Sequence, residues 1–436
     1  MNRTLRRRDF LRQAGAGAAG FWAVTRTGPS VSRSPNEKLN IACIGLGGMG
    51  GGNLNGVSGE NVTALCDPDS NFLDKAAAGR PAAKKFADYR RMFEEIPREF
   101  DAVVISTPDH HHAPAAMAAL RLGKHCYCEK PLTHGVYEAR QVAEAARKAK
   151  VATQMGNRGT SGEEIRRVVE LVQAGAIGAV KEVHCWTNRP IWPQGLDRPP
   201  ARAVPKNLNW DLWLGPAPQR EYHDSLHPFS WRGWWDFGTG ALGDMACHIM
   251  NTPYWALKLG HPSSVEAEGE PRKPDCGPLW MTVRYEFPAQ AGRPPLRLVW
   301  YDGKKNNVPN LPPEELAEGA KISPDGGTLF VGEKGKLLGA QLLPADRSRD
   351  FKPPPATLPR VPDGNHYNDW IRACKGQGPA CSHFDFAGPL TEGVLLGIVA
   401  FRAGKKLPWD GPAMKARGCP EAERYVRRPY RKGWTL

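Results

Sequence analysis

The 436-residue chain lacks the short motifs that identify several large enzyme classes. No Gly-x-Ser-x-Gly elbow, Walker loop or His-Glu-x-x-His sequence occurs. The chain therefore lacks the motifs that serine hydrolases, P-loop kinases and metalloproteases of these types require. No stretch approaches the roughly 20 apolar residues that a membrane-spanning helix needs. From these absences we expect neither those activities nor a membrane span.

The chain also lacks the basic clusters of a nucleic-acid-binding surface, although its formal net charge is +14. The first 33 residues hold seven arginines and one aspartate, so +6 of this charge belongs to them and +8 to the rest. Residues 424–434, close to the C-terminus, group five basic residues among aromatic ones, but this short segment is not an extended basic surface. We therefore expect no nucleic-acid partner.

Cysteine and histidine are present, but not in a pattern that indicates a metal site. Most of the ten cysteines lie in apolar, strand-like runs, where free cysteine behaves as a small hydrophobe. Cys374 and Cys381 are the one pair that we consider for a disulfide. The adjacent histidines 110–112 point in different directions, and Cys126 and Cys128 belong to an expected strand, so we expect no bound metal.

The N-terminus has the layout of an export signal. Arg7 and Arg8 are followed, after one residue, by Phe10 and Leu11, and residues 14–24 form a weakly apolar run of mainly small residues. A basic region before a modest apolar region is typical of signal peptides, and the paired arginines resemble a twin-arginine (Tat) signal. We predict that residues 1–37 are signal and linker and that the protein is exported to the periplasm. The alternative is a basic amphipathic tail.

A glycine-rich turn follows the first apolar strand, residues 39–44. Residues 45–50 read G-L-G-G-M-G, the G-x-G-x-x-G pattern of a dinucleotide-binding turn. The first glycine permits the tight turn, the second allows the pyrophosphate to approach, and the third lets helix and strand pack closely. The following helix directs free N–H groups toward the phosphates. The residues predicted to bind the cofactor here are Gly45, Gly47, Gly48, Met49 and Gly50.

Asp67 ends the second apolar strand, residues 61–66, twenty-two residues after Gly45. At this distance a carboxylate accepts hydrogen bonds from the adenosine ribose hydroxyls. A carboxylate there also repels a 2′-phosphate, so we predict NAD as the cofactor in preference to NADP. The alternative is that Asp67 belongs to a turn or to the start of a helix, because Pro68 and Asp69 follow it.

Strands and helices continue to alternate up to about residue 158. The expected strands are residues 101–106, 125–128 and 151–155, and the expected helices are residues 114–122 and 135–150. This alternation predicts an α/β Rossmann domain, with a parallel, doubly wound sheet, over residues 38–158. Ligands bind at the carboxyl ends of such strands. The further residues predicted to contact the cofactor are Ser106, Thr107, Pro108, His112, Glu129, Lys130 and Asn157.

The order of the motifs resembles the Gfo/Idh/MocA oxidoreductase family, named for glucose-fructose oxidoreductase and inositol dehydrogenase. Four landmarks carry the resemblance: the glycine-rich turn, Thr107-Pro108 with His112 four residues later, Glu129-Lys130-Pro131, and G-A-L-G-D-M-A-C-H at residues 240–248. The resemblance spans roughly residues 38 to 410. It implies an exported, carbohydrate-linked oxidoreductase that assembles as a homodimer or homotetramer.

The resemblance implies a catalytic set of Lys130, Asp244 and His248. Oxidation of a secondary alcohol agrees with such a set, because the hydroxyl must lose a proton while its carbon lies against the nicotinamide. Lys130 ends a strand, where a cationic ring and partial burial are expected to lower its pKa. Asp244 and His248 are spaced i, i+4, so a helix places them on one face and the carboxylate can orient the imidazole. The chain departs from the family pattern at Ala246, where Gly is common, and at Asn251, where Asp is common.

Residues 159–436 show a different pattern, with strands in runs after a helix at residues 163–174. The expected strands are residues 180–187, 279–287, 296–301 and 328–331. They indicate a C-terminal α+β domain with a large, mainly antiparallel sheet. Residues 188–238 form a long segment rich in Pro and Trp, and loops of this length are usually functional. Half or more of its tryptophans are expected to pack the loop onto the sheet. The residues predicted to contact a carbohydrate substrate are Tyr222, Arg232, Trp235 and His366.

Three functions are consistent with these residues. The first is an NAD-dependent oxidoreductase that acts on a secondary hydroxyl of a sugar. The second is a glycoside-cleaving enzyme that oxidises carbon 3 transiently, eliminates the leaving group and restores the alcohol. The third is a non-catalytic, nucleotide-dependent sensor, which would not need Lys130, Asp244 and His248. Because no soluble NAD pool exists outside the cytoplasm, we expect an exported enzyme to keep its cofactor tightly bound.

Overall fold

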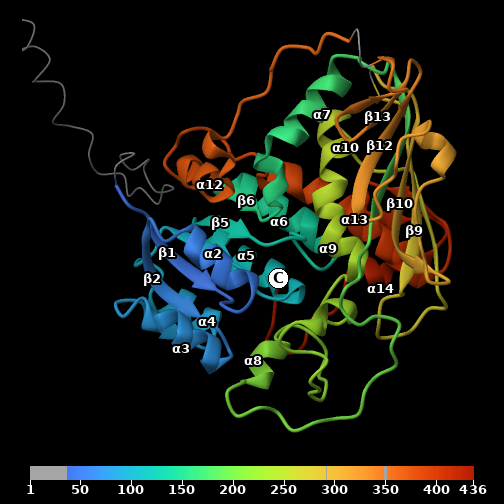
Figure 1. Cartoon of the computed structure of the whole chain (residues 1–436). Helices are drawn as coiled ribbons and strands as arrows, with labels where there is room; N and C mark the ends of the chain where they lie inside the picture. The colour runs from blue at the N-terminus through green and yellow to red at the C-terminus, as the bar shows by residue number, and fades with distance from the viewer. Residues whose placement is uncertain (1–36, 291, 348–350) are drawn as a thin grey trace, which may run out of the picture. The chain divides into compact units, whose positions relative to one another are not determined.

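Two sheets organise the part of the chain that the structure describes, which is residues 37–436 except residue 291 and residues 348–350 (Figure 1). The structure is a computed structural model. The predicted export signal, residues 1–37, lies outside the described residues apart from Glu37.

The first sheet contains six parallel strands in the order β3-β2-β1-β4-β5-β6. This order, with helices between the strands, confirms the predicted doubly wound Rossmann domain. The order reverses between β1 and β4, which leaves a crevice at the carboxyl ends of these strands. The strands are Asn40–Ile44 (β1), Asn61–Cys66 (β2), Lys84–Phe86 (β3), Ala102–Ile105 (β4), His125–Cys128 (β5) and Thr153–Met155 (β6). The helices are Met49–Gly56 (α2), Ser70–Ala78 (α3), Tyr89–Glu95 (α4), Asp109–Arg121 (α5) and Val136–Ala149 (α6).

Helix α5 begins at Asp109, earlier than the predicted start at residue 114. Pro114 lies inside the helix and has no N–H to donate to the carbonyl of His110. That carbonyl instead accepts a hydrogen bond of 2.7 Å from Nη2 of Arg428. A residue near the C-terminus therefore satisfies the backbone group that Pro114 leaves free, and the helix extends back to the end of β4.

The second sheet runs β14-β13-β12-β7-β10-β9-β8-β15-β16, with β11 paired to β10. Neighbouring strands are antiparallel except β7 and β10, which confirms the predicted α+β domain with a mainly antiparallel sheet. The strands are Val180–Thr187 (β7), Ser264–Gly269 (β8), Trp280–Phe287 (β9), Leu296–Lys305 (β10), Val308–Pro309 (β11), Gly326–Gly332 (β12), Lys336–Leu338 (β13), Gln341–Leu343 (β14), Leu407–Asp410 (β15) and Lys415–Ala416 (β16).

Helices of the C-terminal part pack on both sheets. Trp370 of α12 is buried in the core cluster that contains β1, whereas α9 packs on β7, β10 and β12. The α-helices are Glu163–Gln173 (α7), Trp210–Leu214 (α8), Gly240–Ile249 (α9), Asn251–Ala256 (α10), His366–Cys374 (α12), Phe384–Ala403 (α13) and Glu423–Val426 (α14). The 3-10 helices are Arg158–Ser161, Ser230–Gly233, Glu314–Ala317, Pro362–Gly364 and Pro420–Ala422.

Helix α13 connects the two sheets, because it contacts α6 as well as α9 and β8. By length and composition alone its 20 residues are apolar enough to cross a membrane, so the expectation that no such run exists was wrong. However, 83% of this apolar window is buried among the described residues. The core helix of a soluble protein has the same length and composition, so this feature is only weak evidence for a membrane span.

All ten cysteines are free. Cys374 is buried and Cys381 is partly exposed, and the disulfide considered between them is not formed. Sγ of Cys381 lies 3.3 Å from Oγ of Ser161 instead. The other nine cysteines are buried, as expected for residues that act as small hydrophobes.

Close packing of α13 depends on Gly393, and we predict that Gly393→Ala destabilises the protein. An added Cβ would collide with the hydroxyl oxygen of the buried Tyr254. Overpacking of this kind costs about 1–3 kcal/mol, which exceeds the gain in helix propensity on average. Urea unfolding monitored by tryptophan fluorescence measures the loss. Gly79→Ala is the matched control, because its Cβ would meet nothing within 4 Å, and an equal effect of both substitutions would contradict the packing argument.

Candidate functional site

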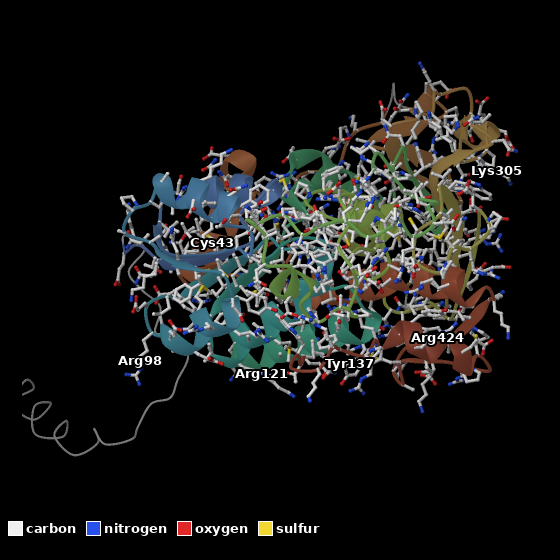
Figure 2. The ribbon with its side chains drawn as sticks, turned by 90° about the horizontal axis from the view of Figure 1, so that it is seen from below. Cys43, Arg98, Arg121, Tyr137, Lys305 and Arg424 are labelled. Atoms are coloured by element: carbon white, nitrogen blue, oxygen red, sulfur yellow. The ribbon has the colours of Figure 1, made fainter. Side chains whose placement is uncertain are left out.

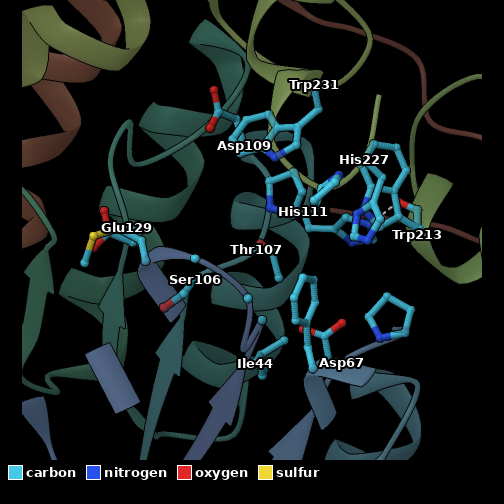
Figure 3. Close-up of a pocket in the computed structure, with 18 of the residues that line it drawn as sticks. Ile44, Asp67, Ser106, Thr107, Asp109, His111, Glu129, Trp213, His227 and Trp231 are labelled. Atoms are coloured by element: carbon cyan, nitrogen blue, oxygen red, sulfur yellow. Dashed lines mark hydrogen bonds between the residues drawn. The ribbon is translucent and has the colours of Figure 1, made fainter. Parts of the chain in front are cut away.

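A cavity of about 460 Å³ opens where the strand order of the first sheet reverses (Figure 3). One wall consists of the glycine-rich turn and the residues that end β2 and β4. The opposite wall comes from the Trp-rich segment and includes Trp213, His227 and Trp231. Lys130, Arg232 and Asp244 lie together in its lining. The volume suits one ligand of small-molecule or cofactor size.

The glycines of the glycine-rich turn have two functions: some allow close packing of the protein backbone, and one leaves open space for a ligand. Gly45 has φ of +80°, and a Cβ there would lie 2.6 Å from the carbonyl carbon of Ser106. A Cβ at Gly50 would collide with the carbonyl oxygen of Gly45, so both glycines serve the close contact of turn, helix and strand. A Cβ at Gly47 would lie 2.7 Å from Cε2 of the Phe72 ring, so this glycine makes room for that ring. A Cβ at Gly48, which caps α2, would meet nothing within 4 Å.

Asp67 lies at the end of β2, only 6% exposed, and lines the cavity. Its carboxylate accepts hydrogen bonds from the backbone N–H of Leu46 at 2.7 Å and of Asp69 at 2.9 Å. Burial raises the pKa of Asp67 to about 6, against the opposing effect of these N–H groups. The N-cap of α3 is Asp69, so Asp67 does not have the alternative role of starting this helix.

Polar groups at the ends of β4 and β5 also line the cavity. Oγ of Ser106 accepts a hydrogen bond of 2.7 Å from Asn53, whose amide also donates to Glu129 at 3.0 Å. The hydroxyl of Thr107 is buried and has no hydrogen-bond partner among the described residues. Pro108 lies beside it in the lining. An unsatisfied hydroxyl, an open glycine and a buried carboxylate together fit a dinucleotide with ribose and phosphate groups.

Lys130 and Asp244 form an ion pair in the same cavity. Nζ of Lys130 lies 2.8 Å from Oδ1 of Asp244, and each side chain is 14% exposed. Nε of Arg232 lies 3.5 Å from the same oxygen. Burial lowers the pKa of Lys130, but the charges of Asp244 and Glu129 outweigh it, so the net shift is upward. The predicted lowering of this pKa was wrong for the protein without cofactor, because the sequence did not show that a carboxylate pairs with Lys130.

His248 lies one helical turn after Asp244 on α9 but is not part of the cavity lining. Between these two described residues there is no hydrogen bond, so the predicted Asp–His pair was wrong; the carboxylate bonds Lys130 instead. Burial, followed by the charge of Lys130, lowers the pKa of His248 to about 3. Its imidazole is therefore neutral at pH 7 and, in the protein without ligand, is a weak proton acceptor.

Asp109 is a cavity residue that sequence reasoning missed. It is the first residue of α5, is 4% exposed, and accepts a hydrogen bond of 2.7 Å from the hydroxyl of Thr239 (Figure 3). Burial raises its pKa to about 7, and the charge of Asp244 adds to the shift. The only signal in the sequence was an acidic residue directly after Thr-Pro. A helix-starting aspartate accounts for the same pattern, so nothing marked it as a cavity residue.

His112 and Asn157, which were predicted to contact the cofactor, are absent from the cavity lining. Both ring nitrogens of His112 face backbone carbonyls, those of Pro131 at 2.7 Å and Thr107 at 2.9 Å. The side-chain amide of Asn157 donates to the carbonyl of Cys247 at 3.2 Å. These side chains hold the loops and α9 in place, and their contact with a cofactor stays a prediction.

Three of the four predicted substrate residues also lie outside this cavity. Tyr222 packs its ring edge-on against Trp210, inside the aromatic cluster of the long segment. The ring of His366 is held by the carbonyl of Met155 at 2.8 Å, and Trp235 is buried in the main core. Only Arg232 lines the cavity. The aromatic and polar character of these residues serves packing, which the sequence pattern could not distinguish from substrate binding.

Residues 205–237, which we call the strap, extend from the C-terminal part of the chain to the first sheet. Asp69 at the N-terminus of α3 accepts hydrogen bonds from Nδ2 of Asn207 at 2.7 Å, and it pairs with Nε2 of His227 at 2.9 Å. The N–H of Ser70 donates to the carbonyl of Asn207 at 2.8 Å, and that of Asn209 to Pro68 at 2.9 Å. The strap therefore encloses the cavity beside Asp67.

Comparisons with known proteins agree with this geometry. Residues 39–157 match the profile of an oxidoreductase family with an NAD-binding Rossmann fold, and residues 160–293 match that family's C-terminal alpha/beta domain. The two matches cover more than half of the chain. Inositol 2-dehydrogenase of Rhodococcus erythropolis is 32% identical over 170 residues, which is 38% of this chain and 48% of that protein. A glycosyl hydrolase family 109 protein of Shewanella pealeana is 28% identical over 200 residues, or 40% and 44% of the two chains.

The chain thus spans about half the length of the curated relatives it matches. Among solved structures, the WlbA dehydrogenase from Bordetella pertussis, in complex with NADH and UDP-GlcNAcA, has a TM-score of 0.58 and 17% identity. The similarity covers 86% of this chain and 99% of that one. At this identity the likeness concerns the fold.

The buried position of Asp109 predicts a pH-dependent cost that Asp109→Asn removes. Its pKa is about 7 in the folded protein against an ordinary 3.8, so the folded state holds the proton more tightly. Its contribution to stability is complete below pH 3.8 and is lost as the pH rises to about 7, by at most about 1.4 kcal/mol per pH unit. The variant should gain stability relative to wild type over this window, measured by urea unfolding at pH 4, 6 and 8.

Asp74→Asn is the control for this experiment, because it removes an exposed carboxylate. A stability difference between wild type and Asp109→Asn that stays constant from pH 4 to pH 8 would contradict the prediction.

Proposed function

The chain belongs to the Gfo/Idh/MocA oxidoreductase family, and on this premise we propose that it is an NAD-dependent enzyme that oxidises a secondary hydroxyl of a sugar or sugar derivative. The observation that carries the proposal is the cluster of Lys130, Asp244 and Arg232 in the same cavity as the glycine-rich turn. A nucleotide on the turn and charged groups at the other end leave space for a polar substrate between them.

The residues of the cavity favour NAD as the resident cofactor. Gly48 and the N-terminus of α2 would hold the pyrophosphate, and Asp67 would accept from the adenosine ribose. A 2′-phosphate beside the Asp67 carboxylate would be repelled, which favours NAD over NADP. When bound, NAD supplies the acceptor for the hydride that leaves the alcohol carbon.

The residues of this chain supply proton transfer and charge stabilisation. Lys130 stays cationic, so we assign it to donating a hydrogen bond to the substrate hydroxyl, which lowers the pKa of that hydroxyl. Asp244 holds the ammonium in place at 2.8 Å. We keep His248, the neutral imidazole on α9, as the proposed proton acceptor, which requires bound substrate and cofactor to raise its pKa from about 3. Arg232 keeps the cavity attractive to hydroxyl and alkoxide oxygens.

The strap supports the proposal that the cofactor stays bound after export. Asn207 and His227 hold the strap to Asp69 beside the place proposed for the nucleotide, and these contacts would slow its dissociation. Retention allows the enzyme to be loaded before Tat export and to work in the periplasm. The net reaction is then redox-neutral, or a second substrate reoxidises the cofactor.

A second candidate function is glycoside cleavage by transient oxidation and elimination. Elimination needs a base that removes a proton from the carbon next to the new ketone. Asp109 supports this candidate, because it lines the cavity and has a pKa of about 7, near the working pH of a general base. The similarity to glycosyl hydrolase family 109 proteins agrees with it. A non-catalytic sensor would have no use for such a set of acid–base groups.

We predict that Lys130→Met lowers kcat at least about 100-fold with an oxidisable sugar. The reason is that the variant loses the ammonium charge that stabilises the reacting oxygen. Absorbance of reduced cofactor at 340 nm, in rapid mixing with the sugar, measures the effect. Lys84→Met removes an exposed lysine paired with Glu99 and should leave kcat unchanged. A Lys130→Met enzyme with wild-type kcat and normal cofactor content would overturn the assignment.

The protein purified without added nucleotide is expected to contain about one NAD per chain. Denaturation followed by mass spectrometry and absorbance identifies any nucleotide that is released. The holoprotein is then incubated with sugars and aryl glycosides without added cofactor. Ketosugar formation supports the oxidoreductase, and release of free aglycone supports the glycoside-cleaving alternative. Absence of nucleotide, with turnover only in added NAD, would contradict the retained cofactor.

A further inference from the structure

A second cavity, of about 40 Å³, lies apart from the cofactor cavity. Four segments meet there: the N-terminal end of α6 from His134, residues 235–239 that lead into α9, the C-terminal half of α13, and α14 with the residues after it. The two cavities share no lining residue, but Thr239 of the second donates a hydrogen bond to Asp109 of the first.

The lining of the second cavity is strongly positive. It contains Arg402, Arg424 and Arg428, and no aspartate or glutamate is among its lining residues. The charge of Arg428 is paired, because its Nε lies 2.7 Å from Oε1 of Glu138. Arg424 is exposed and lies at the molecular surface of the C-terminal part (Figure 2).

Arg402 is the uncompensated charge. No ion pair or hydrogen bond involves its guanidinium within residues 37–436, excluding 291 and 348–350. The guanidinium instead lies 5.4 Å from the ring of Trp235 and 4.3 Å from that of Tyr425. Burial lowers the pKa of Arg402, with Asp236 and Asp275 acting in the opposite direction from a distance. Arg402 is partly exposed, and the part of its charge that is removed from water would be stabilised by an anion.

One N–H donor of the same cavity has no acceptor among the described residues. Trp235 is 4% exposed, and its Nε1 is buried without a hydrogen-bond partner among the described residues. Nε2 of His134 is also buried without a hydrogen-bond partner, but it is a donor in only one of the two tautomers of the neutral ring. Burial lowers the pKa of His134 well below its usual value, and the charges of Arg428 and Arg402 add to the shift, against the carbonyls of Trp235 and Gly238. Buried donors are almost always satisfied, so a ligand with acceptor capacity is expected here.

We propose that the second cavity binds a small monovalent inorganic anion, such as chloride, between the guanidinium of Arg402 and the indole N–H of Trp235. The volume of about 40 Å³ accommodates a single ion and excludes a sugar or a nucleotide. Water would satisfy the indole N–H but would leave the charge of Arg402 uncompensated. The ion ties residues 235–239 to α13 and so stabilises the segment that carries Thr239 into α9. This inference does not depend on the proposed function.

Crystals of the full chain soaked in sodium bromide test the site directly. Bromide is an anomalous scatterer that replaces chloride, and we expect a difference peak in contact with Arg402 and Trp235 Nε1. In solution, chloride replaces gluconate at constant ionic strength while Tm is measured. At about 100 times its dissociation constant, chloride should raise Tm by about 3 °C. No peak in the cavity, or a Tm that does not respond to chloride, would overturn the proposal.

Variants separate this ion from ions bound elsewhere on a basic protein. Trp235→Phe removes one N–H with little change of shape, and Arg402→Met removes the charge, so each should abolish most of the chloride-dependent rise in Tm. Arg427→Met is the matched control, because Arg427 is a nearby exposed arginine that lies over Tyr137 and does not line the cavity. If Arg402→Met does not fold, Trp235→Phe decides alone. A wild-type chloride response in Trp235→Phe, or its loss in Arg427→Met, would contradict the assignment.

Discussion

The ion pair between Lys130 and Asp244 is the contact on which the cavity depends, because it joins the two sheets at the reacting end. Lys130 follows β5 of the parallel sheet, and Asp244 lies on α9, which packs on the antiparallel sheet. Two charges at 14% exposure lose much of their hydration, so neither is stable there alone. Arg232 and Glu129 add opposite charges around the pair. The position of α9, and with it that of His248, therefore follows from electrostatics as well as from packing.

Polar side chains that do not reach the cavity keep this arrangement in place. His112 holds the loop after β4 against the loop after β5, and Asn157 holds the end of α9 against the end of β6. His366 similarly ties α12 to β6. Such residues use their hydrogen bonds on backbone carbonyls, where replacement would leave buried groups unsatisfied. Their presence in a motif reflects a role in positioning the site. A motif alone does not distinguish this role from direct contact with a ligand.

The strap shows how an aromatic-rich segment serves both stability and function. Tyr222, Trp210 and Trp234 form a small core of their own, which lets a segment without long helices keep a defined shape. That shape positions Trp213 and His227 across the cavity from the first sheet. Aromatic burial thus supplies the rigidity, and a few polar contacts to Asp69 supply the attachment. A binding wall built in this way encloses its ligand without depending on a flexible loop.

The amino-acid sequence by itself determined the two sheets and the glycine-rich turn, because these depend on local periodicity and on backbone conformations that few residues adopt. It also indicated Lys130 and Asp244, which lie within motifs, and Asp67, which directly follows β2. Only the tertiary structure decided which groups pair, because distances between residues more than one hundred positions apart are absent from a linear pattern. The Asp244 carboxylate, expected to orient His248, accepts a hydrogen bond from Lys130 instead. In the same way, Asp109, a lone aspartate after Thr-Pro, accepts a hydrogen bond from Thr239 at the start of α9, and burial raises its pKa although this hydrogen bond acts in the opposite direction.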